Sequence, residues 1–426
     1  MAGESRDRRT SSGNSRAPWV IVAGGFQHRG GLDRANAALA RHLAEDEHPV
    51  HLVGHTIDPE LAAMPMVTIH RVPKPVPIDE LLSHRLSELC RAPAGSFLLG
   101  ERLLDRRGRR VAREVTESHP DARVLVNGAN CIWPDINWVH AVHHAWRPSV
   151  AGAPLWFKAK RHAEAWRNAR RQFTALKIAR LVIANSDRTR RDLLELVGLA
   201  PERVHTVWMG CDLWREVTPQ RRADARSWLR KPPGRPLVIF VGELGHDRNK
   251  GFDTLLHAWR RLCARPDWDA DLIAAGGGRA VDSWRRKIER VGLGARITML
   301  GFTDRIADLV AAADLLVSPV RYEAYGLNVH EALCCGVPAI VSACAGVADR
   351  YRLEMRDMLL PDPEDAADLA ARLMRWRADM AGWKARVESL ALELRERSWD
   401  DMADEIVALA ERGSQESCSR TQTMDG

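Results

Sequence analysis

Short apolar runs alternate with amphipathic, helix-like stretches along most of this chain. Short apolar runs between polar or turn-forming residues are typical of strands buried in a parallel sheet. From Trp19 to about Glu216 such runs are separated by helical stretches such as 36–45, and this alternation indicates a parallel sheet. The strands predicted in this part are 19–23, 50–53, 124–126 and 181–184.

A second alternating series begins at Leu237. The stretch from Pro219 to Pro236 is rich in turn-forming residues, and we interpret it as a linker between two domains. A chain of 426 residues can build two domains, each with its own core. The strands predicted in the second series are 237–241, 272–275, 297–300, 314–319 and 338–341. The predicted fold class is α/β, with Rossmann-like, doubly wound domains at 18–216 and 217–382 and C-terminal helices at 383–412.

The two ends of the chain lack this apolar pattern. Residues 1–17 are rich in Arg, Ser and Gly, and residues 413–426 are polar, so we expect disordered tails. No apolar run is long enough to span a membrane, and none follows the N-terminal arginines as in a secretory signal. We therefore expect a cytoplasmic protein, either free or associated with the cytoplasmic face of a membrane.

The eight cysteines are scattered and show no C-x-x-C zinc spacing. We expect them to be reduced thiols, several of which pack as small apolar side chains. The formal net charge of +7 is modest for this length and does not indicate a nucleic-acid partner.

One segment of the chain is strongly basic. Between Lys158 and Arg180, eight Lys and Arg residues are accompanied by the single acid Glu164, with aromatic residues interleaved. A helix of this composition suits an anionic membrane surface or an acidic or lipid-linked acceptor. The alternative is a helix that packs Trp166 and Phe173 on its own domain and leaves its arginines in water.

Two carboxylates lie on either side of a predicted strand-loop-helix turn. Glu323 follows the predicted strand 314–319, and Glu331 lies one turn into a predicted helix, 328–335, which Gly336 ends. In open parallel sheets, ligands bind beyond the carboxyl ends of the strands, and amides at the next helix N-terminus suit an anionic diphosphate. A carboxylate only accepts hydrogen bonds, so beside a phosphate it suits the hydroxyl groups of a sugar.

This geometry predicts separate tasks for the two carboxylates. Glu323 is positioned to reach a donor sugar, and Glu331 is positioned to reach a nucleotide ribose. A structural alternative stays open, because Asn328 and Glu331 have the spacing of a helix capping box and Glu323 is then an ordinary loop residue.

The pair resembles the E-x7-E signature of retaining GT-B glycosyltransferases of family 4, also called glycosyltransferase group 1. Other segments resemble further motifs of that family in order and distance, and the resemblance covers roughly residues 18 to 412. These segments are the glycine loop Gly24–Gly31, the histidine segment Trp138–His143, Ile183–Ser186, Met209–Asp212 and Phe240–Phe252.

The resemblance implies two domains that face each other across a cleft, with the donor on the C-terminal side and the acceptor on the N-terminal side. It further implies that the C-terminal helices, 383–412, cross back to the N-terminal domain. It also implies transfer of a hexose from a nucleotide diphosphate sugar, with retention, by a front-face reaction that needs neither metal nor cofactor. The implied catalytic residues are His140, Glu323 and Lys250, with His143 as the alternative to His140. The residues implied in donor binding are Gly30, Gly31, Arg248, Lys250, Phe302, Glu323, Gly326, Leu327 and Glu331.

Several alternatives stay open at this point. The acceptor is a glycan, a lipid-linked molecule or a small molecule, and the donor base and the oligomeric state are undetermined. Double displacement needs a carboxylate nucleophile, and the sequence identifies none in the first domain. The competing functions are a GT-B nucleotide-sugar epimerase or hydrolase, and a non-catalytic nucleotide-sugar-binding or membrane-scaffolding protein.

Overall fold

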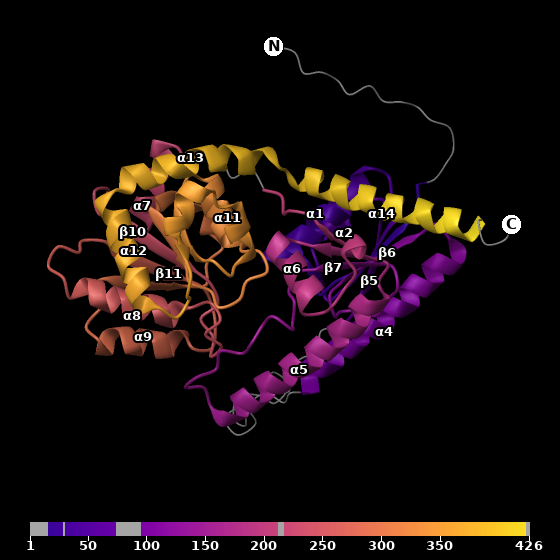
Figure 1. Ribbon diagram of the computed structural model, residues 1–426, viewed down its shortest axis with the longest axis horizontal. Helices are drawn as coiled ribbons and strands as arrows, with labels where there is room; N and C mark the ends of the chain where they lie inside the picture. The colour runs from indigo at the N-terminus through magenta and orange to yellow at the C-terminus, as the bar shows by residue number, and fades with distance from the viewer. Residues whose placement is uncertain (1–15, 29, 74–94, 212–216, 423–426) are drawn as a thin grey trace, which may run out of the picture.

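The computed structural model describes residues 16–28, 30–73, 95–211 and 217–422. Two parallel sheets, each with helices packed around it, form the two halves of the molecule (Figure 1). This is the α/β architecture that the sequence predicts.

The first sheet has seven parallel strands in the spatial order β5-β3-β1-β6-β7-β8-β9. Its strands are β1 (Trp19–Val22), β3 (Val50–Gly54), β5 (Val67–Arg71), β6 (Arg123–Asn127), β7 (Ile136–Val139), β8 (Leu181–Ala184) and β9 (Val204–Thr206). Its helices are α1 (Gly31–Glu45), α2 (Pro59–Ala62), α4 (Gly95–Ser118), α5 (Leu155–Ile178), α6 (Asp187–Glu195) and the 3-10 turn η1 (Pro201–Arg203). A separate two-stranded ribbon pairs β2 (Gly25–Phe26) with β4 (Thr56–Ile57).

The second sheet has six parallel strands in the order β12-β11-β10-β13-β14-β15. They are β10 (Leu237–Val241), β11 (Asp271–Ala275), β12 (Ile297–Gly301), β13 (Leu315–Ser318), β14 (Ala339–Ser342) and β15 (Leu359–Leu360). The helices in this part of the chain are α7 (Pro219–Trp228), α8 (Phe252–Cys263), α9 (Val281–Arg290), α10 (Ile306–Ala312), α11 (Leu327–Cys334), α12 (Ala366–Ala378), α13 (Met380–Glu396) and α14 (Trp399–Gln422), with 3-10 turns η2 (Gly346–Arg350) and η3 (Leu353–Met358).

Each predicted strand overlaps an observed strand, because a strand covered on both faces must be apolar throughout. In β1, β8 and β13 every residue is buried. Both sheets reverse their strand order beside the first strand, since β3 and β6 flank β1 and β11 and β13 flank β10. Ligands of open α/β sheets bind at the carboxyl ends of strands at such switch points. The fold therefore provides one ligand position in each half.

The stretch interpreted as a linker contains a helix, α7. Thr218 caps it by accepting a hydrogen bond from the Arg221 amide, and Pro219 occupies its first turn. Buried Arg226 on α7 donates to the Asp314 carboxylate at 2.6 Å and to the Pro232 carbonyl oxygen at 2.8 Å. The Thr-Pro pair is a helix-start signal that the turn-rich composition obscured.

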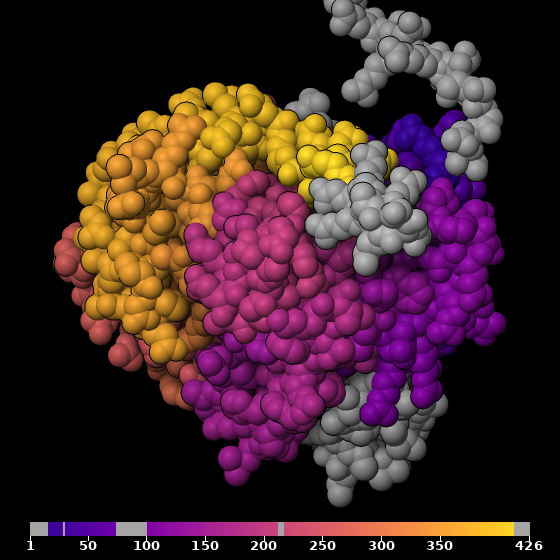
Figure 2. All heavy atoms as spheres, turned by 45° about the vertical axis from the view of Figure 1, so that its right-hand side comes forward, coloured from indigo at the N-terminus to yellow at the C-terminus, as the bar shows by residue number. Residues whose placement is uncertain are grey.

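The last two helices belong to different halves. Trp383 and Val387 on α13 pack in the core of the second half, whereas Met402 and Ile406 on α14 pack in the core that contains β1. The chain crosses back between these helices, and Figure 2 shows this yellow C-terminal segment lying against both halves. Helix α14 continues to Gln422 and so overlaps the tail from residue 413 that we expect to be disordered. The residues after Gly413 contain no proline to break the helix.

Helix α5 confirms that the basic segment is helical. The alternative in which Trp166 and Phe173 pack on their own domain is wrong, because both side chains are exposed. Trp166 is 64% exposed and Phe173 is 40% exposed. Arg167 instead points inward and donates to Glu101 of α4 at 3.2 Å, beside which α5 runs (Figure 1). In the described part of the chain, every helix is too short or too polar to cross a membrane.

Candidate functional site

The loop after β13 presents Glu323 and leads into α11. Gly326 is the N-cap of α11 at φ 109°, a conformation that favours glycine. The capping-box alternative is wrong, because Asn328 donates its side-chain amide to the Val241 carbonyl oxygen at 2.9 Å and does not cap α11. This hydrogen bond instead connects the N-terminus of α11 to the end of β10.

Glu331 lies on the buried side of α11, and its carboxylate accepts a hydrogen bond from Arg34 of α1. The two side chains form an ion pair that joins the two halves of the molecule. Sequence reasoning missed Arg34. Its position one turn after Gly31, at the helix start that follows the glycine loop, was the only local signal.

Lys250 lies in the loop between β10 and α8. Its ammonium group pairs with the Glu323 carboxylate, and the charge of Glu323 is the main cause of the raised pKa of Lys250. The next residue, Gly251, has φ 72°, and a Cβ atom there would lie 1.8 Å from the Pro319 carbonyl oxygen. Only glycine allows this close approach, which holds Lys250 beside the β13 loop.

His140 follows β7, and its ring lies 4.4 Å from the Trp138 ring, measured between centroids. Burial lowers the pKa of His140 to about 3, so its imidazole is neutral near pH 7. Its Nε2 atom is buried and has no hydrogen-bond partner among the described residues. A neutral ring with a free polar atom can exchange hydrogen bonds with a sugar hydroxyl group.

Gly30 and Gly31 form the start of α1, with Gly30 as its N-cap at φ 82°. A Cβ atom on Gly31 would lie 2.7 Å from Leu327 Cδ1. The N-termini of α1 and α11 therefore meet closely across the two halves, and both direct backbone amides toward the space between them.

These elements enclose a cavity of about 310 Å³. Six of the residues predicted for the site line it, namely Gly31, His140, Lys250, Glu323, Gly326 and Leu327. It is completed by Leu32, Asn185, Met209, Val241, Tyr325 and Asn328.

A second cavity, of about 260 Å³, shares His140 and Glu323 with the first. His143 lines this second cavity, and burial lowers the pKa of His143 to about 4. His140 therefore lies where the two cavities meet, and His143 lines only the second. Glu164 of α5 also lines the second cavity, so the first domain does contribute a carboxylate that the sequence did not identify.

Four predicted donor-binding residues, Gly30, Arg248, Phe302 and Glu331, do not line the cavity. Gly30 and Glu331 lie on the helices α1 and α11 that border it, at the N-cap and one turn in. The guanidinium of Arg248 pairs with Asp253 at 3.7 Å, and its backbone amide donates to the Ser149 carbonyl oxygen at 2.8 Å. Phe302 is 72% exposed beside Gly277. Arg248 thus joins the two halves.

Further contacts across the cleft also escaped sequence reasoning. Tyr322 accepts a hydrogen bond from the Val142 amide at 2.6 Å, and burial raises the pKa of its hydroxyl. Ser186 donates to the Ala324 carbonyl oxygen at 2.7 Å. The loop that carries Glu323 is therefore fastened to the first half immediately on either side of the carboxylate.

Each half of the chain matches a known protein family. The family described as Glycosyltransferase Family 4 matches residues 29–215, and the family described as Glycosyl transferases group 1 matches residues 235–379. D-inositol 3-phosphate glycosyltransferase 2 of Catenulispora acidiphila is 33% identical over 205 residues, which cover 45% of this chain and 47% of that protein. D-inositol 3-phosphate glycosyltransferase of Thermobifida fusca is 30% identical over 247 residues, which cover 51% of this chain and 56% of that protein. The chain thus spans about half the length of these curated relatives.

Solved structures share the fold. Sucrose-phosphate synthase from Thermosynechococcus elongatus has a TM-score of 0.70 at 21% identity, covering 93% of this chain and 99% of that chain. Anabaena Alr3699/HepE, solved in complex with UDP and glucose, has a TM-score of 0.64 at 18% identity, covering 93% of this chain and 100% of that chain. The glycosyltransferase WaaG has a TM-score of 0.64 at 17% identity, covering 92% and 99%. With its first half matched by one of the two family descriptions and its second half by the other, the chain belongs to the family 4, or group 1, glycosyltransferases.

Proposed function

We propose that this chain is a retaining glycosyltransferase that transfers a hexose from a nucleotide diphosphate sugar to an acceptor bound by the first half. The observation that carries the proposal is the convergence of Lys250 and the N-termini of α1 and α11 at one cavity. Helix amides and an ammonium group both attract a diphosphate. Fixed positive charge at a leaving group also stabilises the negative charge that grows there in the transition state.

The two cavities support separate positions for donor and acceptor. The donor would occupy the cavity at α1 and α11, and the acceptor would occupy the second cavity, with His140 and Glu323 where they meet. A structural neighbour that was solved with UDP and glucose supports a nucleotide-sugar donor. The base of the donor nucleotide is to be identified by thermal-shift assay with UDP-, GDP- and ADP-sugars.

We favour a front-face reaction without metal, in which the departing phosphate takes the acceptor proton. The carboxylate that double displacement would need is Glu164, but Arg161 at 3.4 Å and Lys160 at 3.7 Å hold it in ion pairs. Its oxygen atoms are therefore already engaged by cations of its own helix. Neutral His140 would orient the donor sugar through hydrogen bonds.

The exposed face of α5 supports a lipid-linked acceptor brought by peripheral contact with an anionic membrane. Trp166 and Phe173 point outward there, with Arg170 over the Trp166 ring at 5.0 Å and Lys177 over the Phe173 ring at 5.3 Å. Exposed aromatic rings among basic residues suit the interfacial region of a charged bilayer. The same helix carries Glu164 into the acceptor cavity, so membrane contact and acceptor binding would be adjacent.

The test is a thermal-shift assay of the full chain with UDP-, GDP- and ADP-sugars. One donor class should stabilise the protein by about 2.7 kcal/mol when its concentration is a hundred times its Kd. Lys250→Ala should lose this stabilisation, while Lys384→Ala, which removes an exposed lysine on α13, should keep it. No stabilisation by any donor, or unchanged stabilisation of Lys250→Ala, would refute the donor site.

A transfer assay then separates the competing functions. The acceptors to compare are D-inositol 3-phosphate, which the curated relatives' names suggest, a lipid-linked sugar and a free glycan. Product with retained anomeric configuration supports the proposal, and donor turnover without acceptor supports an epimerase or hydrolase. Donor binding without any turnover supports a non-catalytic role. Glu164→Gln should keep its turnover, and its inactivation would indicate double displacement instead.

A further inference from the structure

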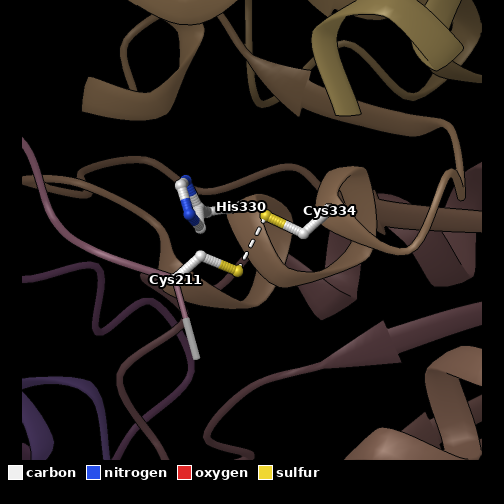
Figure 3. Close-up of side chains that lie close together, drawn as sticks. All are labelled: Cys211, His330 and Cys334. Atoms are coloured by element: carbon white, nitrogen blue, oxygen red, sulfur yellow. Dashed lines mark hydrogen bonds between the residues drawn. The ribbon is translucent and has the colours of Figure 1, made fainter. Parts of the chain in front are cut away.

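Three side chains that the proposed reaction does not use lie together behind the donor cavity. Cys211 belongs to the segment that leaves the first half, while His330 and Cys334 lie one turn apart on α11 (Figure 3). His330 is 1% exposed, Cys334 is 0% exposed and Cys211 is 8% exposed. The two sulfur atoms are 3.0 Å apart, and one atom from each residue lies within 4.8 Å of the other two.

The imidazole of His330 has one satisfied and one unsatisfied nitrogen. Its Nδ1 atom is 2.7 Å from the Tyr325 hydroxyl oxygen. Its Nε2 atom is buried and has no hydrogen-bond partner in the described part of the chain. A buried polar atom without a partner has lost the hydrogen bonds that it made in water, so the arrangement calls for a partner at this nitrogen. Figure 3 shows the imidazole beside the two sulfurs.

We propose that Cys211, His330 and Cys334 bind one soft d10 cation, Zn²⁺ or Cu⁺, which ties the segment leaving the first half to α11. Thiolate and imidazole ligands suit both ions. Two sulfurs bound tetrahedrally at about 2.3 Å from zinc lie roughly 3.7 Å apart, so the observed pair would separate by less than about 1 Å.

The binding step balances without any further reactant. Two S–H bonds break, two metal–sulfur bonds form, and the two protons pass to solvent. His330 binds through the lone pair on Nε2, and its Nδ1–H group donates a hydrogen bond to the Tyr325 hydroxyl oxygen. A hydrogen bond of this kind from the second ring nitrogen fixes the tautomer and orientation of a metal-binding histidine.

A disulfide between Cys211 and Cys334 explains the cluster less well. It would need a two-electron oxidant to reach thiols that are almost completely buried. It would also leave the unpaired nitrogen of His330 without a partner. The cation accounts for all three residues, and its position on α11 makes it structural and separate from the reaction at His140.

The experiment uses the full chain, purified with a reductant and freed of metal with a chelator. It is titrated with Zn²⁺ alone and, without oxygen, with Cu⁺ alone, and followed by native mass spectrometry and thermal unfolding. One ion should bind per chain and raise the Tm, and competition between the two ions should show which is preferred. Cys211→Ser, Cys334→Ser and His330→Ala should each weaken binding at least tenfold.

Two control variants show whether the cluster itself is responsible. Cys263→Ser changes a thiol outside the cluster, and His28→Ala disrupts the exposed group of His28, Asp58 and Glu60 that could also collect metal. Both variants should bind as the unaltered chain does. Circular dichroism checks that each variant is folded. A similar loss of affinity in all three cluster variants shows that the three residues form one site.

Three results would overturn the proposal. The first is no uptake of either ion by the folded chain. The second is uptake that survives in Cys334→Ser and disappears in His28→Ala. The third is loss of two mass units on treatment with hydrogen peroxide, with Cys211 and Cys334 recovered as one linked peptide pair from a chain that takes up no metal.

Discussion

At the scale of single residues, two histidines at the cleft make the stability of this protein sensitive to acid. Burial lowers the pKa of His140 to about 3 and that of His143 to about 4, from an ordinary value near 6.5. Between those values the unfolded chain binds protons that the folded chain does not, so the free energy of unfolding falls as pH falls. This contribution is fully present above about pH 6.5 and is lost progressively toward pH 3.

Urea unfolding at pH 7, 5.5 and 4.5 checks this prediction. A pKa difference of one corresponds to about 1.36 kcal/mol, so the loss at each histidine should reach a few kcal/mol at most. His140→Gln should flatten the dependence on pH, whereas His162→Gln, at an exposed position on α5, should not. An unchanged slope in His140→Gln would show that its burial does not control protonation.

At the scale of elements, α5 gives a testable membrane surface. Its inward arginines are fixed by acids, as Arg171 is by Asp105 at 3.2 Å, which leaves Trp166 and Phe173 free to point outward. Replacing both aromatics by Ala should weaken binding to vesicles containing anionic lipid by about a hundredfold or more, since burying each large apolar side chain contributes about 1.5–3 kcal/mol.

Vesicle sedimentation measures this binding, and added salt should weaken it by screening the basic residues. Leu392→Ala, which removes an exposed apolar side chain on α13, is the matched control and should bind normally. Equal binding to neutral and anionic vesicles, or no effect of the double substitution, would contradict membrane contact through α5.

The elements also show what the sequence could and could not reveal. Fully buried strands such as β13 are visible as apolar runs, and the strand-loop-helix order placed Glu323 beyond the end of a strand. Lys250 and His140 came instead from the resemblance to a known family. By contrast, the pairing of Arg34 with Glu331 joins positions 297 residues apart. The contact of Cys211 with Cys334 joins positions 123 residues apart. Periodicity describes one element at a time, so contacts between elements of different halves require the fold.

At the scale of the whole molecule, the chain passes between the two halves twice, and the two passages lie together. The Cys211 amide donates to the Arg397 carbonyl oxygen at 2.9 Å, and the Arg397 guanidinium donates to the Trp208 carbonyl oxygen at 3.0 Å. Gly210 lies at the same place. These contacts make the paired segments the natural pivot for any opening of the cleft, because at both passages the chain itself runs from one half to the other.

Gly210→Ala should disturb this pivot. A Cβ atom on Gly210 would lie 2.5 Å from both the Ser398 carbonyl oxygen and the Trp399 amide nitrogen, which are backbone atoms that cannot rotate away. Overpacking of this kind costs about 1–3 kcal/mol, so urea unfolding should show that loss, and small-angle scattering should show a larger radius of gyration. Gly234→Ala is the matched control, since a Cβ atom there meets no other atom within 4 Å. If Gly210→Ala is as stable and as compact as Gly234→Ala, the two passages are not packed against each other in solution, and the pivot must lie elsewhere.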